Sequence, residues 1–160
     1  LLVRDVARRL KERGGDAAKL DARAAAQIEM IRAVDAAWRS RLQPMRGRAI
    51  VTHHNAFSRP AERYGFRVAT VIRAGAGEPT PGEIAEVVRT IRAEQVRAVL
   101  VEPQYDAAIA QRLAAAAGVP VRTIDPVGSG DWEAMMRKNL DAVAAALGEA
   151  SPSPTPERRP

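Results

Sequence analysis

Residues 48–57 read Arg-Ala-Ile-Val-Thr-His-His-Asn-Ala-Phe, a short β-branched run that ends in the chain's only two histidines. The run 48–52 has the composition of a buried strand, and Ser58-Arg59-Pro60 resembles the start of a helix. In open parallel sheets, ligands bind at the edge where strands give way to helices. His53 and His54 are therefore the first candidates for a functional site.

Three further runs rich in Val and Ile follow at regular intervals. We expect strands at 48–52, 67–72, 97–101 and 120–124, covered on both faces, with helices at 58–64, 80–95, 106–117 and 131–147. Alternation of strand and helix predicts right-handed crossovers and a parallel sheet. The predicted fold class is α/β, a lobe built on a four-stranded parallel sheet with flanking helices, preceded by a long helix.

Several helix boundaries have characteristic sequences. Thr80-Pro81-Gly82-Glu83 has capping-box spacing with proline at the first helical position. Gly118 is expected to end a helix, and Asp131 is expected either to begin one or to bind a ligand. Residues 1–43 are predicted to be helical with an interruption at Gly14-Gly15, after which Asp16 or Asp21 caps a longer helix.

Composition divides the chain into residues 1–43, the α/β lobe of residues 44–147, and a tail of residues 148–160. The tail is polar and rich in proline and serine, so we expect it to be disordered. The chain opens in helical sequence without an initiator Met or a signal sequence, so we also expect its N-terminus to be truncated. No apolar run approaches the roughly 20 residues that a membrane-spanning helix needs.

The overall composition excludes several kinds of chemistry. Without cysteine there are no disulfides, thiolate metal sites, iron–sulfur clusters or thiol nucleophiles. The net charge of +6 comes from arginines interleaved with Asp and Glu, and aromatic residues make up only 4% of the chain. This pattern favours a solvated arginine-rich surface, and no nucleic-acid partner is expected.

Chemically useful side chains follow the predicted strands. His54 and Asp125 are the principal candidates for metal ligands, and His53 and Glu102 are candidates for either coordination or support of an imidazole. Imidazole nitrogen and carboxylate oxygen are ligands for zinc, manganese or iron. Adjacent histidines on an extended backbone point to opposite sides, so we expect one to coordinate. A zinc site needs further ligands, which another domain or chain would supply.

Other interpretations fit the same residues. A histidine at a strand end can be a polar cap, an Asp-Pro pair can form a turn, and Glu102 can be a solvated loop residue. Gly75-Ala-Gly77 and Gly128-Ser-Gly130 are weak candidates for phosphate binding because neither continues as a P-loop. A hydrolase would use Ser58 or Ser129 with a histidine and Asp125, although no nucleophile-elbow sequence is present. We do not expect an enzyme, and a metal-free ligand-binding or interaction module is the main alternative.

The order of the motifs resembles the C-terminal half of the metal-binding lipoproteins that feed zinc and manganese ABC importers. The resemblance covers nearly all of residues 1–147. It is carried by Val51-Thr-His-His-Asn-Ala-Phe57, Arg63-Tyr-Gly-Phe66, Gly77-Glu-Pro-Thr-Pro81, Val101-Glu-Pro-Gln-Tyr105, Ile124-Asp-Pro126 and Met135-Met-Arg-Lys-Asn-Leu140.

The resemblance implies two lobes joined by one long rigid helix, with the metal in the cleft between them. Residues 1–43 would be the end of the N-terminal lobe and the linking helix. The family's C-terminal ligands fall on His54 and Asp125, and two more histidines would lie in an N-terminal lobe outside this chain. The implied cargo is zinc ahead of manganese and the implied partner is an ABC importer permease. The implied protein is a monomer at the periplasmic or extracellular face, lipid-anchored in its full-length form.

Overall fold

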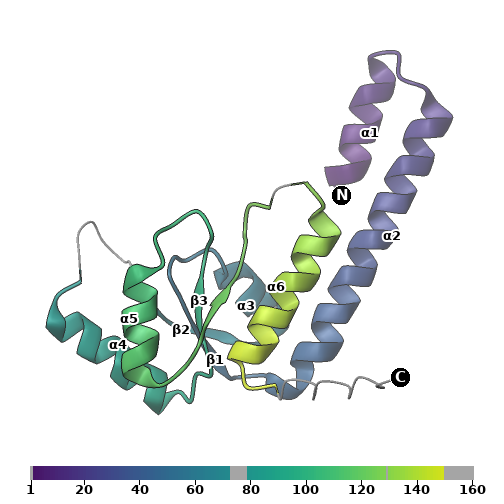
Figure 1. Ribbon diagram of the computed structural model, residues 1–160. Coiled ribbons are helices and arrows are strands. Elements are labelled where there is room, and N and C mark those ends of the chain that lie inside the picture. Colours follow the sequence, from purple (N-terminus) through teal and green to yellow (C-terminus); the bar gives the residue numbers. More distant parts are fainter. Residues whose placement is uncertain (1, 73–78, 129, 150–160) are drawn as a thin grey trace, which may run out of the picture. The chain divides into compact units, whose positions relative to one another are not determined.

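The computed structural model describes residues 2–72, 79–128 and 130–149, and it falls into two compact units, Leu1–Ser40 and Arg41–Pro160 (Figure 1). The helices are α1 (Leu2–Glu12), α2 (Ala17–Leu42), the short 3-10 helix η1 (Gln43–Met45), α3 (Ser58–Tyr64), α4 (Pro81–Ala93), α5 (Ala108–Ala117) and α6 (Trp132–Ala146). The strands are β1 (Ala49–Thr52), β2 (Arg67–Val71), β3 (Val99–Val101) and β4 (Val121–Thr123). No helix among the described residues is both long enough and apolar enough to cross a bilayer.

In the first unit, α1 folds back along the first part of α2 (Figure 1). The connection is tight at Gly15, where a Cβ would lie 2.7 Å from Leu20 Cδ1, so a larger residue would collide there. Asp16 begins α2, because its carboxylate accepts a hydrogen bond from the Lys19 amide at 3.1 Å. Of the two caps proposed from the sequence, Asp16 is the one used, and Asp21 lies within α2 and pairs with Lys11.

The second unit contains a parallel sheet with strand order β2-β1-β3-β4, which confirms the predicted fold class. From β1 the chain moves outward to β2, and from β3 it moves outward to β4 on the other side. The loops that follow β1 and β3 therefore lead in opposite directions. Such a reversal leaves a crevice at the carboxyl edge of the two central strands, the usual ligand position in open α/β sheets.

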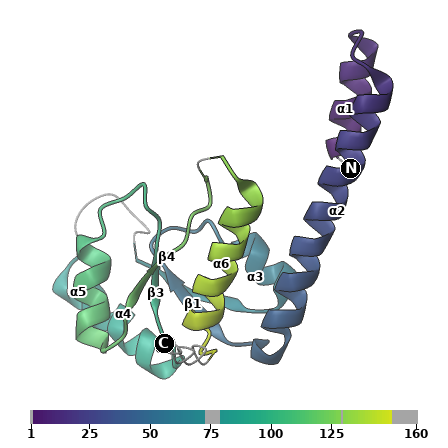
Figure 2. The same cartoon turned by 45° about the vertical axis from the view of Figure 1, so that its right-hand side comes forward.

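Helices cover both faces of the sheet. Figures 1 and 2 show α4 and α5 on one side and α3 and α6 on the other. On the α4–α5 side the core includes Val51, Val99, Ile91 and Leu113, all at most 1% exposed. The central strands β1 and β3 are buried throughout, whereas β2 and β4 are partly exposed. The two edge strands, which have a neighbouring strand on one side only, are thus less buried than the sequence predicts for strands covered on both faces.

The predicted helix boundaries in this unit are confirmed. Thr80 and Glu83 form a reciprocal capping box, Gly118 ends α5 in the left-handed region at φ 74°, and Asp131 accepts from the Ala134 amide to begin α6.

Arg41 pairs with Glu149 at 2.7 Å and also with Asp141, and these two carboxylates raise the pKa of Arg41. Residues 150–160 of the predicted tail lie outside the described residues.

Candidate metal centre at the switch point

The two histidines lie where β1 ends. The His53 amide donates to Leu100 O at 2.9 Å, and the backbone then bends through residues 53–55. The ring centroids of His53 and His54 are 4.5 Å apart with the ring planes at 82°. The expectation that the two imidazoles point to opposite sides is therefore wrong, because the chain leaves the extended conformation at this position. The His53 side chain is 1% exposed, whereas that of His54 is 31% exposed.

Glu102, directly after β3, lies between the two imidazoles. Its Oε2 is 3.4 Å from His54 Nδ1 and 3.8 Å from His53 Nδ1, and its side chain is only 1% exposed. One ligand atom from each of His53, His54 and Glu102 can be chosen so that all lie within 4.8 Å of one another. Among the described residues, Glu102 Oε1 is buried without a hydrogen-bond partner. A buried carboxylate with unused acceptor capacity suits either a cation or a protonated ring nitrogen.

The contact between Glu102 and His54 has a consequence for the imidazole. A carboxylate can only accept a hydrogen bond, so it favours the tautomer of His54 that carries its proton on Nδ1. The lone pair of the neutral ring then lies on Nε2, at the opposite edge. Carboxylates commonly hold metal-binding histidines in this way, and they also increase the basicity of the ligating nitrogen.

Asp125 follows β4, two strands away from His54 across β3. Its Oδ1 accepts hydrogen bonds from the Gly128 amide at 2.9 Å, from Gln104 Nε2 at 2.9 Å and from the Val127 amide at 3.0 Å. These donors, the Gly128 amide first, lower the pKa of Asp125 below its ordinary value of 3.8. Neighbouring strands lie about 4.8 Å apart, so the carboxyl ends of β1 and β4, with β3 between them, are separated by roughly 10 Å. Asp125 is not part of the group formed by His53, His54 and Glu102.

Two residues on other elements fix this edge of the sheet. Asn139 of α6, 2% exposed, accepts from the Asp125 amide at 2.8 Å and donates to the Asp125 carbonyl at 2.6 Å. The Tyr105 ring stacks on His54, with centroids 3.8 Å apart and planes at 28°. Neither residue was predicted from the sequence to have a role at the site. A usable signal existed for Asn139, a lone polar residue on the buried stripe that continues through Val143 and Ala146.

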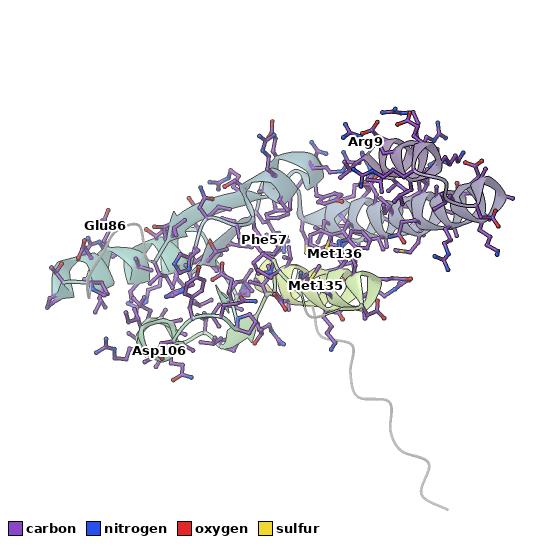
Figure 3. All side chains as sticks on the ribbon, turned by 90° about the horizontal axis from the view of Figure 1, so that it is seen from above. Arg9, Phe57, Glu86, Asp106, Met135 and Met136 are labelled. Carbon is purple, nitrogen blue, oxygen red and sulfur yellow. The ribbon has the colours of Figure 1, made fainter. Side chains whose placement is uncertain are left out.

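A hollow of about 450 Å³ lies beside Asp125. Its wall includes Met135, which is labelled in Figure 3, together with Lys138 and Asn139 from the same helix. The Met135 sulfur would lie 2.6 Å from a Cβ placed on Gly128, so the loop after β4 packs directly against α6. Packing of this kind restrains the backbone that carries Asp125.

The remaining candidates from the sequence have other surroundings. The Ser58 hydroxyl, at the start of α3, donates a hydrogen bond to the side chain of Asn55. This hydroxyl is therefore used in a local contact. The Gly128 amide is already used by Asp125, so the Gly128–Gly130 segment cannot offer that donor to a phosphate. Ser129 and the Gly75–Gly77 segment lie outside the described residues.

Residues 1–146 match the protein family described as zinc-uptake complex component A, periplasmic. The zinc-binding lipoprotein AdcA of Streptococcus pneumoniae serotype 4 is 28% identical over 145 residues, covering 84% of this chain and 29% of that protein. A crystal structure of ZnuA superimposes with a TM-score of 0.79 at 22% identity, covering 89% of this chain and 55% of that one. The Mn²⁺ complex of FpvC from Pseudomonas aeruginosa gives a TM-score of 0.68 at 24% identity, covering 89% and 56%. These two structural similarities show a shared fold, and this chain spans little more than half the length of either solved protein.

Proposed function

Since the chain belongs to the family of periplasmic zinc-uptake complex components A, we propose that it captures a divalent transition metal for delivery to an ABC importer. Zinc is the proposed cargo ahead of manganese. The observation that carries the proposal is the Glu102–His54 contact, at 3.4 Å, at the carboxyl edge of the two central strands. This contact leaves the Nε2 edge of a half-exposed imidazole as a metal ligand at the position where open α/β sheets bind ligands.

We propose that His54 and Asp125 are the ligands supplied by this chain. His54 would contribute Nε2, and Asp125 would contribute Oδ2, because Oδ1 already accepts three hydrogen bonds. His53 and Glu102 either complete the coordination or hold the His54 ring. Two ligands are half of a tetrahedral zinc site, so the remaining ligands would come from an N-terminal lobe outside this chain.

The donor set supports zinc as the cargo. Imidazole is a borderline ligand that suits zinc, whereas manganese favours sites dominated by oxygen. The relative AdcA is named as a zinc-binding lipoprotein, and FpvC was solved with Mn²⁺. We also propose where the protein acts and with which partner.

The protein would act as a monomer at the periplasmic or extracellular face, anchored by lipid in its full-length form. There it would deliver the ion to a membrane permease.

The direct test is calorimetric titration of the 160-residue chain with zinc and then with manganese. We expect weak but saturable zinc binding with a stoichiometry of one ion per chain, because the chain supplies half of a tetrahedral site, and still weaker manganese binding. Zinc should also raise the melting temperature, because an ion that binds only the folded state stabilises it. A chain that binds neither ion and shows no shift in melting temperature would favour the metal-free module instead.

Zinc affinity should fall as the pH is lowered from about 7.5 to about 5.5. The reason is that protons compete with zinc for the imidazole nitrogen. Asp125 should not contribute to this loss, since its pKa is lowered below 3.8 and it remains a carboxylate throughout the range. Zinc titrations in buffers of equal ionic strength measure the effect. Affinity that is constant across this range would show that no imidazole is a ligand.

Glu102→Gln should weaken zinc binding by about 10–100-fold, the usual cost of losing the partner of a ligating histidine. The amide keeps the shape of the side chain but removes the negative charge beside His54 and His53. The amide nearly conserves the volume of the carboxylate, so no cavity forms and the variant should remain folded. Glu86→Gln is the matched control, because Glu86 is exposed on α4. Equal zinc affinity for both variants would show that Glu102 plays no part in metal binding.

A further inference from the structure

We infer that the turn Glu102–Tyr105 is a positioning element that holds both proposed ligands, and that Gln104 is the residue that orients Asp125. This inference rests on the proposed function, because it assigns roles around the His54 and Asp125 ligands. It concerns residues that follow β3, the strand that separates the two ligands. Glu102, Gln104 and Tyr105 each contact one of the two ligand side chains.

The backbone of this turn is restrained. The Tyr105 amide donates to Glu102 O at 3.2 Å, which closes a four-residue turn with Pro103 in its second position. Proline fixes φ near −65°, the value that this position of a common turn requires. The proline also reduces the freedom that the unfolded chain loses on folding. The three side chains are therefore carried on one preformed piece of backbone.

Gln104 provides a link that the loop after β4 cannot make by itself. Two of the three donors to Asp125 Oδ1, the amides of Val127 and Gly128, belong to the same loop as Asp125. They set the local turn but not its position relative to His54. The third donor, Gln104 Nε2 at 2.9 Å, comes from the loop after β3 and ties the two loops together. Since three donors occupy Oδ1, the metal is left with Oδ2.

Tyr105 restrains the other ligand. Its ring stacks on the face of His54, while Glu102 approaches the Nδ1 edge of the same imidazole. The lone pair of Nε2 lies in the plane of the ring, so a stacked aromatic covers the face without blocking the metal. Together the two contacts fix both the tilt and the rotation of the imidazole. One turn thus sets the orientation of each ligand before the ion arrives, which lowers the entropic cost of binding.

The test compares Gln104→Met with Gln111→Met in the 160-residue chain. Methionine keeps the length of the side chain but removes the donor to Asp125, and Gln111 is an exposed residue of α5 that serves as the control. Nuclear magnetic resonance first measures the χ1 populations of Asp125 from three-bond couplings, without metal. Zinc titration then measures affinity. For Gln104→Met we expect a partial population of further Asp125 rotamers, since the Val127 and Gly128 amides still donate to Oδ1. We also expect zinc binding weaker by about 10-fold and a melting temperature close to that of Gln111→Met.

The two readouts separate this inference from the proposed function. If Asp125 keeps a single rotamer in Gln104→Met, the positioning role is wrong whatever the metal does. If the rotamers mix but zinc affinity equals that of Gln111→Met, Gln104 orients a residue that is not a ligand, and the inference fails. If the unmodified chain binds no zinc, the proposed function fails, and the inference that Gln104 positions a ligand fails with it. In that case the rotamer measurement still decides whether Gln104 orients Asp125.

Discussion

His54→Ala is expected to lower the zinc affinity of the chain by more than about 100-fold, since loss of a supporting partner alone costs 10–100-fold and this change removes the ligand itself. The side chain is 31% exposed, and its contacts include the carboxylate of Glu102, the ring of Tyr105 and the neighbouring His53. Truncation therefore creates no large cavity. Calorimetric titration measures the affinity, and the melting temperature without metal should change little.

Asn55→Ala is the matched control for this variant. Asn55 is an exposed residue of the same bend, and its side chain accepts from the Ser58 hydroxyl. The Asn55→Ala variant should bind zinc with the same affinity as the unmodified chain. If His54→Ala retains the affinity of Asn55→Ala, the imidazole is not a ligand, and the proposed capture of metal at this edge of the sheet is wrong.

Asn139→Ala should destabilise the second unit by about 2–6 kcal/mol, because it leaves two backbone groups of Asp125 without partners at about 1–3 kcal/mol each. Both hydrogen bonds are short, at 2.8 Å and 2.6 Å, and the side chain is 2% exposed. If a water molecule replaces one of these hydrogen bonds in the half-buried loop, the loss in free energy of unfolding lies in the lower part of this range. Urea denaturation measures the change in the free energy of unfolding.

Lys138→Ala is the control for Asn139→Ala, because Lys138 is an exposed neighbour in the same helix. Its effect should lie within about 0.5 kcal/mol, as is usual for surface substitutions. Asn139→Ala should also weaken zinc binding, since the loop that carries Asp125 loses its attachment to α6. A variant as stable as Lys138→Ala would mean that the loop after β4 is held by its packing on Met135 and by its own turn.

The secondary structure was accessible from the sequence because its causes are local. Val- and Ile-rich runs of strand length predicted β1 to β4, and the Thr80–Glu83 spacing predicted the start of α4, since a capping box involves only residues three apart. The exposure of β2 and β4 was not predicted. Whether a strand is central or at an edge depends on strand order, and in this sheet the order departs from the order along the chain.

The candidate site also has a part that could be predicted from the sequence and a part that depends on the tertiary structure. Residue type and position after a strand predict His54 and Asp125 as ligands, and the same features predict that Glu102 either coordinates the metal or supports an imidazole. The bend at residues 53–55 brought both imidazoles towards one carboxylate, which contradicts the alternation expected of an extended chain. Gln104, Tyr105 and Asn139 were missed as functional residues, because each acts on a partner in a different loop or helix.

The α/β class, the helix caps and the kinds of side chain available at the ends of the strands follow from the amino-acid sequence, because periodicity, capping and residue chemistry are properties of neighbouring residues. The contact of Glu102 with His54 and the hydrogen bonds of Asp125 with Gln104 and Asn139 form only in the folded chain. Those contacts join residues 14 to 48 positions apart along the chain, and strand order and helix packing alone bring such distant residues together.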